Sequence, residues 1–316
     1  MPNQFGDQQI QNANYWYEKL PYTFSAALQT VQNAPIFQVS NVGTVSSGQK
    51  MAIISDIAPN AVAGVNLNMN TESDNQALIT TAFPGNLTPD LTAYGDGFRS
   101  TANISMSPQN ETGAVIGNYQ MNYSAAVKRL TTADKIMRGL ALTARDQELQ
   151  AKYNIGKTGL RPPDLEDMLR TVFRSQIIGP KLITFSADAI AGVQTPVSNL
   201  QTVQDEVLII TSIGASTTAG NGVTLNIDRD GQIGYVSVLV DNMSLSKTNR
   251  FNTWIPVKER MGVTLTANTT TATIVNMTVL RLRFSKIIQY MFGVTKTALT
   301  AEDQLLMDEI EAGVLV

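Results

Sequence analysis

The chain has 316 residues, a formal net charge of −3 at pH 7 and 16% charged side chains, against about 25% in an ordinary globular domain. Cysteine and histidine are both absent, which excludes disulfides, thiolate metal sites, Ser-His-Asp triads and proton transfer by histidine. The near balance of acidic and basic residues gives no overall case for nucleic acid or an acidic membrane as a partner. The composition therefore favours a protein without enzymatic activity, although paired carboxylates, Ser-Lys pairs, tyrosine and oxygen-ligated metals stay open.

Asn, Gln, Ser and Thr supply the polarity that the charged residues do not. A neutral polar surface repels its own copies weakly, so it suits a protein that packs against many neighbours; a secreted protein of the same composition is the alternative. The chain has no apolar run near the roughly 20 residues that span a bilayer. The polar segment from Met1 to Gln11 is unlike a signal peptide, so we expect synthesis in a cytoplasm and no membrane partner.

Residues 1–34 are expected to form an N-terminal arm, in which a Gln- and Asn-rich start is followed by an aromatic cluster. One interpretation docks these aromatic side chains onto the chain's own core. The other makes them a hook onto a second subunit, because aromatic residues are enriched among interface anchors. The cluster consists of Tyr15, Trp16, Tyr17, Tyr22 and Phe24.

Residues 35–124 are expected to be rich in β-strands, because short alternating runs are bounded by turn residues. Two of these runs flank the turn Ser46-Ser47-Gly48. Residues 81–97 carry several Pro, Gly and Asp residues, which predicts a long, contact-making loop. The expected strands are 36–45, 50–57, 62–69, 98–106 and 114–123, the last two pairing with each other.

Residues 125–186 are expected to form a helical pair. Thr131 reads as an N-cap with an acidic residue three positions later, and apolar residues at helical spacing continue to about Tyr153. A second helix begins at Arg161-Pro162-Pro163-Asp164 and ends at Gly179-Pro180. The basic residues of the first helix predict an ordinary exposed face, with contact to nucleic acid or to an acidic neighbour as the alternative. They are Lys128, Arg129, Lys135, Arg138, Arg145 and Lys152.

Residues 187–292 are expected to form an antiparallel β-sandwich after a linker at 187–199. Period-two alternation recurs in this region, as where Val223, Leu225 and Ile227 alternate with polar residues. The tetrapeptide Asp228-Arg229-Asp230-Gly231 resembles part of a calcium loop, but the following residues lack the further oxygen ligands, so it predicts a hairpin turn.

Residues 293–316 are expected to form a C-terminal helix, capped at Thr300-Ala301-Glu302-Asp303, and an apolar tail. The whole chain is thus predicted to have a mainly β (α+β) fold. It combines an antiparallel β-sandwich or jelly-roll-like C-terminal domain, a β-rich N-terminal region and a helical pair between them.

Four features of the sequence occur together: Thr- and Asn-rich β segments such as 262–270, the aromatic arm, the loop at 81–97 and the lack of Cys and His. In these features the chain resembles the structural proteins of bacteriophage virions, that is, capsid, decoration, neck or tail components. The resemblance implies a symmetric homo-oligomer that contacts other virion proteins, is located in the virion and is synthesised in the host cytoplasm.

The first functional hypothesis is therefore a non-enzymatic assembly protein with no catalytic, cofactor-binding or metal-binding residues. A carbohydrate-binding or host-attachment module, using Trp254, Tyr235, Asn252 and Arg283, is the second. A glycoside hydrolase is the third, but it needs two carboxyl groups at a set separation, and the cluster Asp164, Glu166 and Asp167 reads as a helix start. The candidate interface anchors are Tyr15, Trp16, Tyr17, Phe24, Phe83, Tyr94 and Val316.

Overall fold

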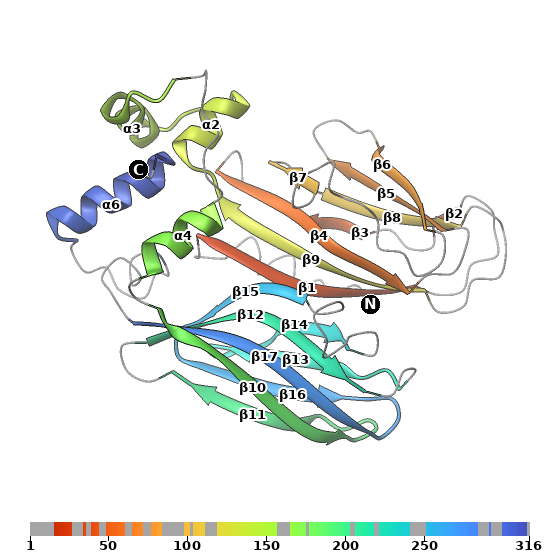
Figure 1. Cartoon of the computed structure of the whole chain (residues 1–316). Helices are drawn as coiled ribbons and strands as arrows, with labels where there is room; N and C mark the ends of the chain where they lie inside the picture. Colours follow the sequence, from red (N-terminus) through yellow and green to blue (C-terminus); the bar gives the residue numbers. More distant parts are fainter. Residues whose placement is uncertain are drawn as a thin grey trace.

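The computed structural model describes sixteen stretches of the chain. They are residues 16–26, 34–35, 39–43, 49–60, 65–71, 77–83, 98–101, 104–110, 119–156, 165–174, 177–202, 206–217, 221–240, 251–283, 291 and 299–314. Within them the fold is mostly antiparallel β-sheet, with the helices gathered at one end of the largest sheet (Figure 1). The predicted mainly β fold class is confirmed.

The largest sheet has eight strands in the order β10-β17-β12-β15-β1-β9-β4-β7. β1 lies in the middle and pairs antiparallel with β15 on one side and β9 on the other. This sheet therefore unites strands from both ends of the sequence. The strands are β1 (Tyr17–Ala26), β4 (Lys50–Asn60), β7 (Phe98–Ser100), β9 (Tyr119–Arg129), β10 (Ile177–Ala189), β12 (Glu206–Ser216), β15 (Phe251–Val257) and β17 (Thr271–Arg283).

A second sheet of four strands, in the order β11-β16-β13-β14, faces the first and forms the sandwich. Alternate residues of its strands are fully buried, among them Leu225, Ile227 and Val263, and they share one apolar core with residues of the large sheet such as Ile210 and Val275. Alternation of this kind buries one face of each strand. The strands are β11 (Thr195–Gln201), β13 (Thr224–Arg229), β14 (Gln232–Leu239) and β16 (Arg260–Thr266).

A third sheet lies beside the β4 and β7 end of the large sheet (Figure 1). Its order is β2-β8-β5-β6, and β3 also pairs with β8. The predicted neighbours at 36–45 and 50–57 are thus in different sheets, since β3 pairs with β8 whereas β4 pairs with β9 and β7. Likewise β9 pairs with β1 and β4, and not with the strand at 98–106. The strands are β2 (Ala34–Pro35), β3 (Val39–Gly43), β5 (Val65–Thr71), β6 (Ala77–Phe83) and β8 (Ile104–Asn110).

The helices of the described chain are α2 (Thr132–Arg138), α3 (Ala144–Tyr153), α4 (Leu165–Phe173) and α6 (Ala301–Ala312). The predicted helix from 131 to 153 is two helices, because Gly139 ends α2 in the left-handed conformation and Thr143 caps a new start. None of these helices has the length and apolar character needed to span a bilayer. α4 and α6 instead cover the end of the large sheet around Trp254, as Leu169 and Ile310 belong to the same buried cluster.

Two segments that were predicted to lie between elements, one as a helix end and one as a linker, belong largely to β-strands. Gly179-Pro180 lies inside β10, at a register shift between Ile177 and Gly179, and does not simply end a helix. Residues 187–199, predicted as a linker, contain the end of β10, a short turn and most of β11. Pro is tolerated in a strand at the edge of a sheet, where its missing N–H faces away from the neighbour, and β10 is such an edge.

Candidate interaction surfaces

The predicted aromatic arm is part of the chain's own core where the structure describes it. Trp16 and Tyr17 are buried, and the Tyr17 ring meets the Trp254 ring edge-on at 6.1 Å between centroids. The Arg129 guanidinium lies 5.3 Å from the centre of the Trp16 ring. These two side chains therefore agree with the interpretation that docks the arm onto the chain's own core, because Trp16, just before β1, and Tyr17, its first residue, share one buried cluster with residues of α4 and α6.

The side chains of the other five predicted interface anchors are not among those that the structure describes. Tyr15, Tyr94 and Val316 lie outside the described residues. Phe24 lies on β1 and Phe83 on β6, but the structure describes only their backbone.

The two aromatic residues of the predicted carbohydrate-binding site are buried and do not lie on the surface. Trp254 is 2% and Tyr235 3% exposed, so neither ring offers a face to a ligand. Burial raises the pKa of Tyr235 well above its usual value, and the Arg229 guanidinium covers the ring at 3.5 Å from its centroid. The sequence places these aromatics on strands correctly, but alternation alone does not say which face the second sheet covers. Asn252 and Arg283 are exposed.

A buried ion pair crosses the sandwich beside Tyr235. Arg229, at the end of β13, donates to the carboxylate of Glu18 on β1, and both side chains are less than 5% exposed. Arg229 also donates to the carbonyl oxygen of Pro256 at 3.3 Å. The pair ties the four-stranded sheet to the middle of the eight-stranded one, and sequence spacing gave no signal for it.

The turn after β13 has the predicted hairpin form. Asp230 and Gly231 both have positive φ, 50° and 87°, as a two-residue hairpin turn requires. The Asp230 carboxylate accepts backbone N–H groups of Lys258 at 3.1 Å and Glu259 at 2.7 Å. Its oxygens thus fasten the neighbouring β15–β16 turn, and no group of three acidic residues in the described chain is arranged to hold a metal ion.

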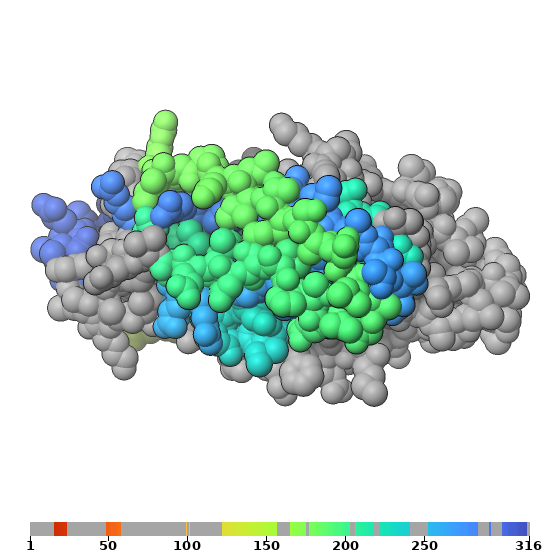
Figure 2. All heavy atoms as spheres, turned by 90° about the horizontal axis from the view of Figure 1, so that it is seen from below, coloured from red at the N-terminus to blue at the C-terminus, as the bar shows by residue number. Residues whose placement is uncertain are grey.

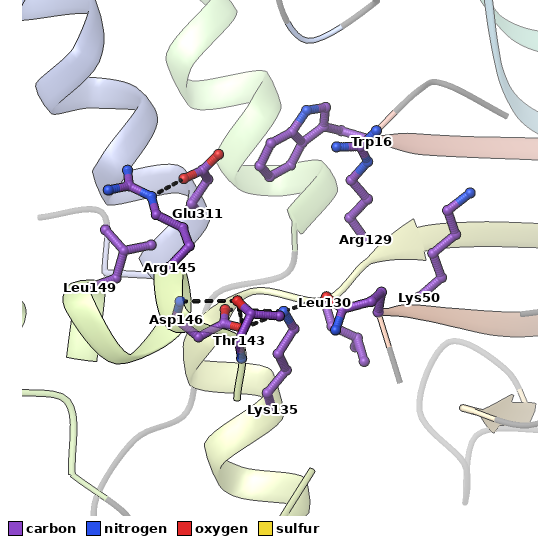
Figure 3. A pocket seen from close by; sticks show the side chains of 11 residues that line it. Trp16, Lys50, Arg129, Leu130, Lys135, Thr143, Arg145, Asp146, Leu149 and Glu311 are labelled. Atoms are coloured by element: carbon purple, nitrogen blue, oxygen red, sulfur yellow. Dashed lines mark hydrogen bonds and ion pairs between the residues drawn. The ribbon is translucent and has the colours of Figure 1, made fainter. Parts of the chain in front are cut away.

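A pocket of about 350 Å³ opens where β4 and β9 meet α2, α3 and α6 (Figure 3). On one side the Lys135 ammonium lies 2.8 Å from Asp146, and on another the Arg145 guanidinium lies 3.1 Å from Glu311. Burial works to raise the pKa of Asp146, but Lys135 and the cap residue Thr143 outweigh it and lower that pKa. Each carboxylate of the lining is therefore bound by a cation of another residue, and these ion pairs connect α2 with α3 and α3 with α6.

Two further basic residues meet at the opposite wall of this pocket. Lys50 on β4 lies directly across from Arg129 on β9. Burial, and then the neighbouring Arg129 charge, lower the pKa of Lys50.

The predicted basic face of the first helix is directed mainly at the protein itself. Asp308 on α6 accepts from Arg145 and, at 2.6 Å, from Lys152, both on α3. Burial works to raise the pKa of Asp308, but Lys152, Gln304 and Arg145 together lower it to about 2. Lys128 is buried, and Lys135 holds Asp146. The contacts of Arg145 and Lys152 with Asp308, which we call the clasp, hold α6 against α3. The sequence did not reveal them because the partners are over 150 residues apart.

The carboxylates at the start of α4 have local roles. Glu166 accepts from Arg170, one turn later on the helix, at 2.5 Å, a pairing that supports an exposed helix. Asp167 is exposed, and Asp164 lies outside the described residues.

Exposed apolar side chains are concentrated on one side of the sandwich. Of the eight large apolar residues exposed in the described part of the chain, five lie on β10, on the turn after it or on the adjacent β17. Figure 2 shows β10 and β11, in green, across the middle of this face. We call this the edge surface; it is formed by Ile178, Leu182, Ile190, Val193 and Ile274.

Comparison with known proteins assigns no family. No protein-family model matches the chain, and no curated protein matches its sequence. The solved structures with some similarity include the STIV MCP, at 10% identity and a TM-score of 0.23 over 84% of this chain and 98% of that one. Others are infectious bursal disease virus, Gt strain, at 10% and 0.22 over 84% and 72%, and Streptomyces albus HEPD, at 10% and 0.21 over 92% and 74%. TM-scores this low show neither a shared fold nor a shared function.

Proposed function

We propose that this chain is a non-enzymatic structural protein that assembles into a symmetric multimer within a viral particle. The observation that carries the proposal is the edge surface, which is apolar and follows the edge strand of the largest sheet. Soluble monomers usually protect sheet edges with charge, proline, bulges or covering segments. Exposed apolar patches of this kind mark protein–protein contacts.

The low charge of this region supports the same proposal. Residues 177–201, which contain β10 and β11, include only two charged side chains, Lys181 and Asp188. Charged residues are depleted at the centres of interfaces. A surface of this composition repels a second copy little and loses little hydration when it is covered.

The assignment to a bacteriophage virion, as a capsid, neck or tail component, is supported by the sequence texture. Thr- and Asn-rich segments such as 262–270 and the low charged fraction suit a protein surrounded by copies of itself. The absence of enzymatic activity is supported by the pocket, where both carboxylates are bound by cations. Contacts with other virion proteins are part of this proposal.

Light scattering of the purified protein over a concentration series, with negative-stain images of the same samples, tests the proposal. We expect a multimer of defined copy number, seen as rings, sheets or shells. The symmetry then separates a capsid component from a neck or tail ring. A monomer at every concentration, including those well above micromolar, would overturn the proposal.

A further inference from the structure

We propose that β10 of one copy pairs antiparallel with β10 of a second copy across a two-fold axis, so that two eight-stranded sheets become one continuous sheet. The inference rests on the proposed assembly function and specifies which surface makes the contact and in what geometry. A two-fold contact uses the same patch on both copies, so each residue's partner is set by the position of the axis.

The backbone of β10 offers the means of pairing. The strand has 13 residues and ends the eight-stranded sheet, and within the described chain it pairs only with β17. Its outer edge therefore presents N–H and C=O groups that a further strand can satisfy. Main-chain pairing of this kind gives affinity wherever an edge is long enough and unprotected.

Protection of the edge is confined to the two ends of the strand, since Asp188 lies one residue before its end. The register shift at Ile177, the left-handed Gly179 with φ of 135° and Pro180 come in its first four residues. Lys181 follows, but residues 182–187 contain neither a charge nor a proline. This six-residue stretch is of ordinary strand length, and it is the part that pairs in the proposed contact.

The charges of β10 favour a second copy in the antiparallel sense. Its only charged residues are Lys181 near the start and Asp188 near the end. In two antiparallel copies the Lys181 end of one strand lies near the Asp188 end of the other, although the two side chains project from opposite faces of the sheet because they are seven residues apart. Parallel copies would place like charges together, which is unfavourable.

The apolar residues of the edge surface also fit this geometry. Ser186 pairs with Ile274 of β17, and Leu182 lies on the same face of the sheet, four residues earlier. With the two-fold axis at Thr184, Leu182 of one copy lies opposite Ser186 of the other. Only that small serine then separates Leu182 from the second copy's Ile274, since adjacent strands are about 4.8 Å apart. The contact covers the side chains of Leu182, which is 58% exposed, and Ile274, which is 37% exposed.

A single-cysteine scan tests the register, because the natural chain has no cysteine that would interfere. Identical residues at the axis lie about 4.5–5.5 Å apart between Cα atoms, which a disulfide accepts. A residue two positions away from the axis lies about 13 Å along the strand from the same residue of the second copy, a distance that no disulfide spans. We expect Thr184→Cys to give a disulfide-linked dimer under mild oxidation, with Leu182→Cys and Ser186→Cys at least tenfold less efficient.

The control is Ile233→Cys, on the exposed start of β14 and away from β10. One sharp maximum anywhere from 182 to 187 supports the antiparallel pairing and sets its axis. Equal cross-linking at all β10 positions would mean parallel pairing or random collision, and equal cross-linking at Ile233→Cys would mean random collision; either result would overturn it. No cross-link in a protein that is still multimeric would overturn the β10 contact alone, whereas a monomeric natural protein would overturn the proposed function itself.

A charge placed on the edge gives a second, independent measurement. Leu182 is 58% exposed, so Leu182→Lys leaves the fold intact and only charges the edge, as natural edge strands do. We expect self-association to weaken at least tenfold, measured by analytical ultracentrifugation, with an unchanged thermal midpoint of the dissociated protein. The matched control, Ile233→Lys, keeps the association of the natural chain. Equal association of the two variants would overturn the inference.

Discussion

The ion pair between Glu18 and Arg229 predicts a large effect from a single uncharged substitution. Replacing Glu18 by Gln keeps the side-chain shape but leaves the Arg229 charge in a place that is 4% exposed. Removing one partner of a buried pair typically costs about 3–5 kcal/mol. The Tyr235 ring at 3.5 Å and the Pro256 carbonyl at 3.3 Å still stabilise the guanidinium, so the lower end, about 3 kcal/mol of unfolding free energy, is expected.

Equilibrium urea denaturation measures this loss, and a double-mutant cycle with Arg229→Met identifies its cause. Arg229→Met alone leaves the Glu18 carboxylate buried without its cation and is expected to cost at least as much. The double variant removes both charges and is expected to recover to within about 1 kcal/mol of the natural protein. A loss below about 1 kcal/mol for Glu18→Gln, or a double variant that shows the sum of both losses, would refute the reasoning.

Two further predictions concern the C-terminal helix. The Asp308 pKa of about 2, below its ordinary 3.8, means that the clasp stabilises the fold above about pH 5 and is lost as pH falls toward 2. Since its cationic partners are partly exposed, Asp308→Asn is expected to cost about 1–2 kcal/mol at pH 7 and nearly nothing at pH 2. Gly313→Ala is expected to cost about 2 kcal/mol in thermal unfolding, because φ is 79° and a Cβ atom would lie 2.6 Å from the Thr131 hydroxyl.

The first prediction is tested by comparing Asp308→Asn at two pH values, and the second by comparing Gly313→Ala with Gly139→Ala. A loss from Asp308→Asn that is independent of pH would mean that the clasp charges contribute nothing. Gly139 also has positive φ but open space around its Cβ position, so Gly139→Ala isolates the backbone cost, about 1 kcal/mol. If the two glycine variants were equally destabilised, the close approach to Thr131 would have no energetic consequence.

Local signals in the sequence predicted local structure well. The capping residues Thr131 and Thr300 both accept from the N–H group three positions later, and Asp230-Gly231 forms the expected turn. The break between α2 and α3 was missed although its signal was present. Thr143 begins the same Thr-x-x-Asp pattern as the other two caps, but apolar spacing continued across it and suggested a single helix.

What the sequence did not reveal depends on contacts between distant residues. Alternation identified strands, yet it did not show that a second sheet covers Tyr235 or that helices cover Trp254. The salt bridge of Arg145 to Asp308 joins residues 163 positions apart, beyond any spacing rule. Within the edge surface each apolar residue looked ordinary in sequence, and only the position of β10 at the end of a sheet brought them together.

The central place of β1 has a consequence for how the chain is made. Lys19 on β1 pairs with Trp254 on β15, which the ribosome adds about 235 residues later. At about 5–20 residues per second this interval is about 12–50 s, long compared with the microseconds in which a hairpin forms. Once β9 has been made, β1 can pair with it, but the other edge of β1 has no native partner until β15 follows. The nascent chain therefore carries an open strand that a chaperone or a second nascent copy can occupy.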